Sequence, residues 1–136
     1  MIWDNTIDKV EVRKEYYESG VLYSETPYVN GKMHGIEKGY FESGALRWET
    51  PYVDGKKHGI VKFYYRSGAL QWEVPYVNGI KHGIEKMYYE SGALWAETPY
   101  VNGKKHGIER GYDKEKSGIY FLALHNKDQE VASVKI

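Results

Sequence analysis

The residues that could do chemistry in this sequence gather in a short cluster of glycine, lysine and histidine. Residues 100–107 read YVNGKKHG, a combination that could bind a phosphate or hold a metal ion. The same eight positions read YVNGKMHG from Tyr28, YVDGKKHG from Tyr52 and YVNGIKHG from Tyr76. Because the cluster recurs at a fixed spacing, it belongs to a repeating framework.

A phosphate-binding loop is disfavoured by the residues around the cluster. A P-loop carries Ser or Thr after its lysine and leads into a helix whose amide groups meet the phosphates. The segment GKKHG from Gly103 lacks that hydroxyl residue and runs into a further strand-like segment. We therefore predict a plain hairpin loop at each copy and no cofactor.

The histidines of these clusters invite comparison with zinc ligands: His34, His58, His82 and His106. Equivalent residues two strands apart are separated by roughly 9–10 Å. Two imidazole nitrogens that share a zinc ion at about 2.1 Å must approach within about 3.5 Å of each other. We therefore predict no metal site, and we expect each histidine to fasten its loop through hydrogen bonds.

A row of glutamates could suggest glycoside hydrolysis: Glu25, Glu49, Glu73 and Glu97. The paired carboxylates of glycosidases lie about 5–9.5 Å apart in a pocket that raises the pKa of one of them. An open row provides no such pocket, so we interpret these residues as a solvated stripe. Candidate Ser-His-Asp residues likewise recur in every unit. We predict that the protein is not an enzyme.

The elements that position these residues follow a period of 24, marked by Gly20, Gly44, Gly68 and Gly92. We divide a single domain of 136 residues into an N-terminal cap strand (1–20), four repeats (21–44, 45–68, 69–92 and 93–118) and a C-terminal capping hairpin (119–136). In the cap strand, KVEVRKEYY alternates, and we expect Ile2, Trp3 and Ile7 to pack over it.

Each repeat reads as a β-hairpin. In the second repeat, residues 45–53 and 60–65 are short runs rich in aromatic and β-branched residues, separated by Asp-Gly and closed by Ser-Gly. The predicted fold class is all-β, an elongated antiparallel meander of 24-residue hairpins. Proline at Pro51 and its equivalents removes a backbone donor, so we place these residues at a bulge or where no ladder bond is needed.

Two registers compete within the repeat. A two-residue Asp-Gly loop pairs Val53 with Lys56, whereas a six-residue loop over DGKKHG pairs Val53 with Ile60 and brings Trp48 opposite Tyr65. We favour the longer loop, because aromatic and β-branched cross-strand pairs stabilise a sheet by roughly 0.2–1 kcal/mol each.

The composition of the chain limits the classes of binding partner that we expect. Lys+Arg and Asp+Glu are both 19, so the formal charge is zero and we expect no nucleic acid partner. The chain has no cysteine and no apolar leader, which favours a reducing cytoplasm. The edge of the predicted sheet that carries the Asn-Gly-Lys-x-His-Gly loops is basic, and we call it the lysine rim. We nevertheless expect no membrane lipid as partner. The basic residues of this rim are Lys32, Lys56, Lys57, Lys81, Lys104 and Lys105, against Asp54.

The repeated segments Tyr-Tyr-x-Ser-Gly and Asn-Gly-Lys-x-His-Gly resemble the MORN repeat, specifically its bacterial variant found in YwqK-family antitoxins. The resemblance covers residues 16–112. It implies a β-hairpin array and, for this group, neutralisation of a cognate toxin encoded nearby, as an immunity protein. MORN proteins elsewhere resemble structural scaffolds or lipid-associated modules, which is the alternative function.

Comparison of the four repeats with one another separates framework from candidate binding residues. Leucine and tyrosine recur at fixed positions, whereas three other columns carry large groups in the central units. Such groups are enriched at protein interfaces. There are two alternative explanations for these large groups. They could fill a curled face of the sheet that narrows at mid-length, or they could reflect random sequence divergence between the repeats. The candidate partner-binding residues are Tyr23, Arg47, Trp48, Phe63, Gln71, Trp72, Met87 and Trp95.

Overall fold

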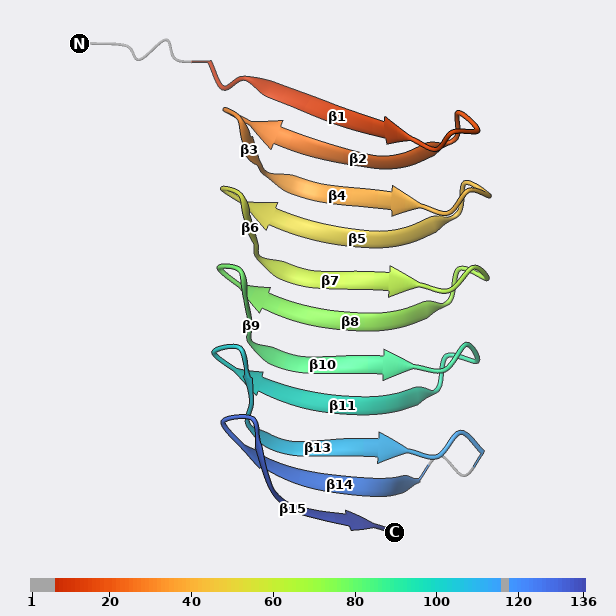
Figure 1. Ribbon diagram of the computed structural model, residues 1–136, viewed down its shortest axis with the longest axis vertical. Coiled ribbons are helices and arrows are strands. Elements are labelled where there is room, and N and C mark those ends of the chain that lie inside the picture. Colours follow the sequence, from red (N-terminus) through yellow and green to blue (C-terminus); the bar gives the residue numbers. More distant parts are fainter. Residues whose placement is uncertain (1–6, 116–117) are drawn as a thin grey trace, which may run out of the picture.

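The protein is one open antiparallel sheet in the computed structural model, which describes residues 7–115 and 118–136 (Figure 1). The predicted all-β meander of hairpins is confirmed, with a repeat of about 24 residues. The sheet order is β1-β2-β4-β5-β7-β8-β10-β11-β13-β14-β15, and each two-residue strand pairs only with the long strand before it.

The long strands have these bounds: β1 Val10–Tyr16, β2 Leu22–Val29, β4 Gly35–Tyr40, β5 Leu46–Val53, β7 Gly59–Tyr64, β8 Leu70–Val77, β10 Gly83–Tyr88, β11 Leu94–Val101, β13 Gly107–Tyr112, β14 Ile119–Asn126 and β15 Gln129–Lys135. The two-residue strands are β3 Lys32–Met33, β6 Lys56–Lys57, β9 Ile80–Lys81 and β12 Lys104–Lys105.

The turn between β5 and β6 is the tight one, so the predicted six-residue loop is wrong. Val53 pairs with Lys56, and Trp48 pairs with Phe63 in place of Tyr65. Asp54 and Gly55 have φ of 48° and 82°, and a residue pair with positive φ forms the two-residue hairpin turn whose twist matches its strands. The Asn-Gly pairs of the other repeats do the same.

The ladder changes register just after this turn. His58 N donates to the Pro51 carbonyl at 3.0 Å, whereas Glu49 already pairs with Lys62 two residues out of step. Gly59 absorbs the change with φ of 119°, and a Cβ at this position would lie 3.0 Å from the Pro51 ring. The proline thus lies beside a local irregularity, as predicted, because its missing donor faces a point where the ladder is interrupted.

A second irregularity lies at the Ser-Gly end of every repeat hairpin. Phe63 pairs with Trp72 and Tyr64 with Leu70, so Gln71 is an extra residue in β8. A bulge of this kind redirects the side chain of the extra residue. Gly68 closes the adjoining turn with φ of 89°, the left-handed conformation expected there.

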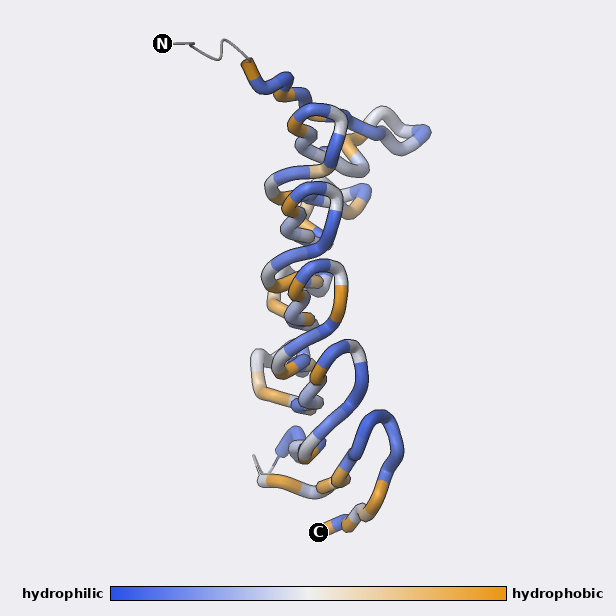
Figure 2. Tube along the Cα trace, turned by 90° about the vertical axis from the view of Figure 1, so that its left-hand side faces the viewer, coloured by the Kyte–Doolittle hydropathy of each residue, from blue (hydrophilic) through white to orange (hydrophobic). Residues whose placement is uncertain are grey.

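The sheet has little core, because the described residues form no second layer over it. The buried apolar residues of the described chain are Val61, Val74 and Ala123, and the first two are paired in neighbouring central strands. Viewed from the Asn-Gly side, the molecule is a narrow stack with hydrophobic and hydrophilic segments interspersed along its height (Figure 2). Stability must therefore come mainly from contacts between adjacent strands.

The two ends of the sheet are open strands. Ile7 is 90% exposed, so the expectation that it packs over β1 is wrong; Ile2 and Trp3 lie outside the described residues. At the other end, β14 and β15 form a hairpin joined through Lys127 and Asp128, both with positive φ. In the part of the chain that the structure describes, no helix is long and apolar enough to cross a membrane.

Candidate functional site

One cross-strand row collects the largest side chains of the central units. Trp48, Phe63, Trp72 and Met87 lie opposite one another in four consecutive long strands. The row continues on either side through small residues, which are Ser24 and Gly39 toward the N-terminus and Ala96 and Gly111 toward the C-terminus. We call the side of the sheet that carries this row the ring face.

The rings of this row pack on one another and on their small neighbours. The Phe63 and Trp72 rings are stacked with centroids 5.2 Å apart. The Trp48 ring covers Gly39, since a Cβ there would lie 2.1 Å from it, and the Tyr23 ring meets Trp48 edge-on at 5.4 Å. Four consecutive large residues, with small residues at both ends of the row, therefore pack along the sheet, and the glycine beside Trp48 gives its ring room to lie over the neighbouring strand.

The bulge brings the neighbouring column to the same face. In a regular strand Arg47 and Trp48 would point to opposite faces. Here Arg47 Cζ lies 5.6 Å from the Trp48 ring, and Arg47 and Gln71 line the same cavity as Trp72. Side chains at two consecutive sequence positions therefore lie on the same face of the sheet. In a regular strand, consecutive side chains alternate between the two faces.

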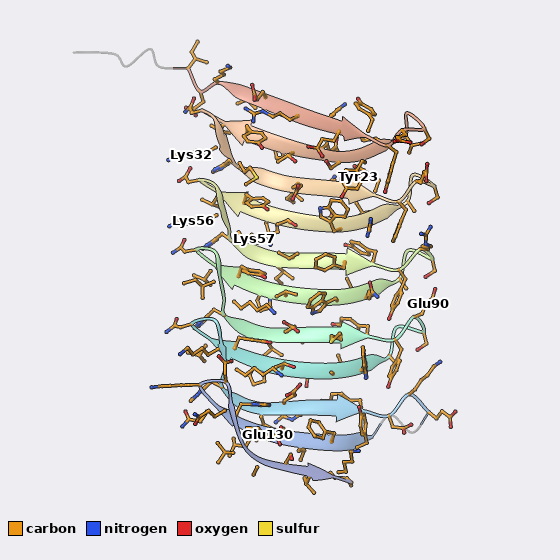
Figure 3. All side chains as sticks on the ribbon, viewed as in Figure 1. Tyr23, Lys32, Lys56, Lys57, Glu90 and Glu130 are labelled. Atoms are coloured by element: carbon orange, nitrogen blue, oxygen red, sulfur yellow. The ribbon has the colours of Figure 1, made fainter. Side chains whose placement is uncertain are left out.

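These two columns border a cavity of about 470 Å³ on the ring face near the Ser-Gly turns. Of the eight predicted binding residues, six line it: Arg47, Phe63, Gln71, Trp72, Met87 and Trp95. The other two, Tyr23 and Trp48, contact each other outside it, and Tyr23 lies near the Ser-Gly end of the ribbon (Figure 3). The remaining lining residues are Phe41, Tyr64, Tyr65 and Tyr88.

The eight residues differ in exposure. Arg47, Gln71 and Trp95 are exposed. The five others are half-buried: Tyr23, Trp48, Phe63, Trp72 and Met87. The Trp72 Nε1 atom is buried and has no hydrogen-bond partner among the described residues. Of the predicted residues that line the cavity, the half-buried Phe63, Trp72 and Met87 therefore form its floor, and the exposed Arg47, Gln71 and Trp95 stand at its rim.

Phe41 lines the cavity and Arg66 lies against the outside of it, over the Phe41 ring; neither was predicted as a binding residue. The guanidinium carbons of Arg47 and Arg66 lie 5.5 and 5.1 Å from the Phe41 ring centroid. Each residue differs from its equivalents in the other hairpins. The equivalents of Phe41 are Tyr17, Tyr65 and Tyr89, and those of Arg66 are Glu18, Glu42 and Glu90. That difference was the signal available in the sequence.

The repeated histidines connect one unit to the next. Nδ1 of His34, His58 and His82 accepts a hydrogen bond from the backbone N–H of Asp54, Asn78 and Asn102, at 3.4, 3.2 and 3.3 Å. Each ring thus fastens the turn of the following unit, rather than its own loop as we had expected. Within residues 7–115 and 118–136, no group of three or more acidic or histidine side chains is arranged to hold a metal ion.

The glutamate row lies on the opposite face, in a ladder of alternating charge. Neighbouring strands pair a lysine or arginine with a glutamate across most of the sheet. We call this side the ladder face. The row is Lys14, Glu25, Lys38, Glu49, Lys62, Glu73, Lys86, Glu97 and Arg110.

Each glutamate of this row also accepts a hydrogen bond from a tyrosine hydroxyl. The distances are 2.6–2.8 Å for the pairs Tyr40–Glu25, Tyr64–Glu49, Tyr88–Glu73 and Tyr112–Glu97. The carboxylate of Glu25 raises the pKa of Tyr40 to about 12. Burial, together with the Glu49 and Glu73 carboxylates, raises the pKa of Tyr64 and Tyr88 to about 12. The row is thus a bonded framework rather than the simple solvated stripe that we predicted.

The lysine rim near the Asn-Gly turns is only partly free. Lys81 and Lys105 pair with Glu85 and Glu109 at 2.7 and 3.3 Å. The buried His125 adds a 2.7 Å contact to Glu109. Although burial raises the pKa of Glu109, the bonds from His125 and Lys105 lower it on balance. Lys57 is half-buried over the Tyr76 ring. The exposed half of the basic rim is therefore Lys32, Lys56 and Lys104, and Lys32 and Lys56 project outward from the sheet edge (Figure 3).

Comparison with known proteins identifies the repeat. The profile of the MORN repeat variant family matches residues 12–30, 33–54, 57–78 and 81–102, which together cover more than half of the chain. No curated protein matches the sequence.

Proposed function

Because the chain belongs to the MORN repeat variant family, we propose that it is a non-catalytic protein-binding module whose partner docks in the ring-face cavity. The observation that carries the proposal is the convergence of six unit-specific residues on one cavity. Aromatic residues, methionine and arginine are enriched in protein interfaces. Trp, Tyr and Arg are also enriched in binding hot spots, which lie in well-packed pockets from which water is excluded. A framework position would not need to differ between repeats.

The ionisable groups that could suggest catalysis have structural partners, which supports a non-enzymatic role. The ladder-face glutamates accept hydrogen bonds from tyrosines. Three of the four repeated histidines accept a hydrogen bond from the next unit's backbone. A residue that makes the same hydrogen bond in each repeat stabilises the repeat structure. An active site instead needs a set of catalytic residues that occurs at one place in the protein.

The finer proposal is that the partner is a bacterial toxin encoded nearby, and that the protein is its cytoplasmic immunity protein or antitoxin. The support is the resemblance of the repeated segments to YwqK-family antitoxins. In this role the ring face covers the toxin's active site or substrate groove. Because protection from a lethal enzyme requires nearly complete occupancy, the binding must be tight.

The test is to co-express the protein with the product of the neighbouring gene. We expect a stoichiometric complex, loss of the toxin's activity in that complex, and survival of cells that express both proteins. A neighbouring product that neither binds nor harms cells would contradict the toxin proposal.

The alternative function, a scaffold or lipid-associated module, predicts different results in the same experiments. Chains would then associate end to end through the open strands β1 and β15, or bind vesicles that contain anionic lipid. Either result in the absence of a protein partner would overturn the binding-module proposal.

A further inference from the structure

The cavity carries a localised positive charge that forms no ion pair with any carboxylate of residues 7–115 and 118–136. Arg47 is the one charged residue among the ten that line it. Arg47 and Arg66 both approach the ring of Phe41. Within the described residues neither guanidinium forms an ion pair. Two free guanidinium groups therefore flank one aromatic wall of the cavity.

The other repeats provide an internal control for these residues. At the equivalents of Phe41, the hydroxyls of Tyr17, Tyr65 and Tyr89 donate to a backbone carbonyl of the next unit at 2.7–3.0 Å. Phe41 has no hydroxyl for the equivalent bond. The fold forms with Tyr at this position and without either arginine in the other repeats, so Phe41, Arg47 and Arg66 are dispensable for the framework.

We propose that this corner of the cavity binds an acidic protein segment, with an apolar side chain seated against Phe63 and Trp72 and its neighbouring carboxylates on Arg47 and Arg66. Guanidinium groups bind carboxylates through strong, charge-assisted hydrogen bonds. The apolar floor accepts the side chain that anchors the segment. The inference rests on the proposed function only in taking a protein segment as the ligand.

The surrounding charges favour a short acidic segment over a nucleic acid strand. Glu42 and Glu90 occupy the loop positions equivalent to Arg66 in the units on either side. A continuous phosphate backbone that crossed several units would meet these carboxylates, and the pair of arginines alone offers too few contacts for it. A short segment can place its carboxylates on Arg47 and Arg66 without running on past Glu42 and Glu90.

The test uses two end-blocked peptides, Asp-Asp-Phe-Asp-Asp and its counterpart with asparagine in place of every aspartate. Binding to the full chain is followed through the indole N–H resonances of Trp72 and Trp95 by NMR. We expect the acidic peptide to shift these resonances and to bind about tenfold more tightly than the asparagine peptide, the effect of one charge-assisted bond.

The matched variant exchanges the arginines for residues that other repeats carry, as R47Q and R66E together. This variant should keep the wild-type circular dichroism spectrum and bind the acidic peptide at least about tenfold more weakly. The control is R13Q, because Arg13 also lies over a tyrosine ring but is already paired with Glu11 at 2.6 Å. It should leave the affinity unchanged.

Equal binding of the two peptides, equal binding by R47Q/R66E, or a preference for a single-stranded oligonucleotide would overturn the inference. The absence of indole shifts at millimolar peptide would do so too. These outcomes are separate from the test of the proposed function. A natural partner that binds R47Q/R66E normally refutes the inference alone, whereas peptide binding without any natural partner refutes the proposed function alone.

Discussion

The Trp72 ring stacks on the Phe63 ring, with centroids 5.2 Å apart and planes inclined by 29°. This contact joins β7 to β8 at the middle of the sheet, in the same strand pair that contains the buried residues Val61 and Val74. The two rings are half-buried and also line the cavity. They therefore serve both the packing of the central hairpins and the floor of the candidate site.

Substitutions in the floor of the cavity should lower the stability of the protein, whereas substitutions at its rim should leave the stability nearly unchanged. Replacement of Trp72 by alanine removes the stacked ring and should lower the free energy of unfolding by about 3 kcal/mol, as large-to-small changes of aromatic residues do. Replacement of the exposed Arg47 by alanine should change it by less than about 0.5 kcal/mol. Urea denaturation measures both. Equal losses would mean that the rim, too, is structural.

Gly39 should tolerate no side chain while Trp48 is present, because its Cβ position lies 2.1 Å from the indole ring. We expect Gly39→Ala to destabilise the protein by roughly 1–3 kcal/mol through overpacking. In a Trp48→Ala background the same substitution should cost little, so a double-mutant cycle isolates the ring contact. A cost that persists without Trp48 would instead indicate a backbone effect.

The tyrosine–glutamate bonds predict a loss of stability at alkaline pH. An unfolded tyrosine ionises near pH 10, whereas the pKa of Tyr40, Tyr64 and Tyr88 is about 12 in the fold. Between these values the unfolded chain has lost protons that the folded chain retains, so the free energy of unfolding falls as pH rises. Below pH 10 the contribution is complete.

Ultraviolet titration of tyrosinate, with circular dichroism recorded in parallel, measures this behaviour. A group of tyrosines should ionise only as the sheet is lost, and Tyr88→Phe should remove one member of that group. Ionisation of every tyrosine near pH 10 with the sheet intact would refute the assigned bonds.

Removal of one whole repeat, residues 69–92, should leave a folded and shorter sheet. Each hairpin contacts mainly its neighbours, and the deletion brings β7 against β11 with Phe63 opposite Ala96. The melting temperature should fall because Phe63 loses the Trp72 stack. Deletion of Trp72 alone should be worse, because a one-residue slip turns side chains to the wrong face. Comparable unfolding of both variants would contradict modularity.

The hairpins, their period and the glycine turns could be predicted because each depends on local residue chemistry. The strand register could not be predicted. Cross-strand pairing preferences favour the long loop, but they do not include the change of register that a glycine with positive φ allows just after a tight turn. Gly59 has φ of 119° and lets one strand change register beside Pro51. A tight turn and aromatic pairing across β5 and β7 therefore coexist.

The candidate site was predicted only in part for a related reason. Comparison of repeats found residues that vary in size, such as Arg47 and Trp72. It could not show that a bulge brings neighbouring columns to one face, because that depends on the pairing of β7 with β8. The tyrosine–glutamate bonds join residues 15 positions apart, so they too appear only once the register is known.

The measurement that most directly tests the central claim is calorimetric titration of the partner protein with two triple variants, one from each face. Alanine at Arg47, Gln71 and Met87 alters the ring-face cavity. Alanine at Ile36, Ile60 and Ile84 alters the exposed apolar row of the ladder face. Both proteins must first show the wild-type circular dichroism spectrum.

If the ring face is the binding site, the first variant should weaken binding by at least about a hundredfold, the loss expected for one or two hot-spot residues. The second variant should bind like wild type. Unchanged affinity of the ring-face variant, together with lost affinity of the ladder-face variant, would contradict the account and move the binding site to the opposite side of the sheet.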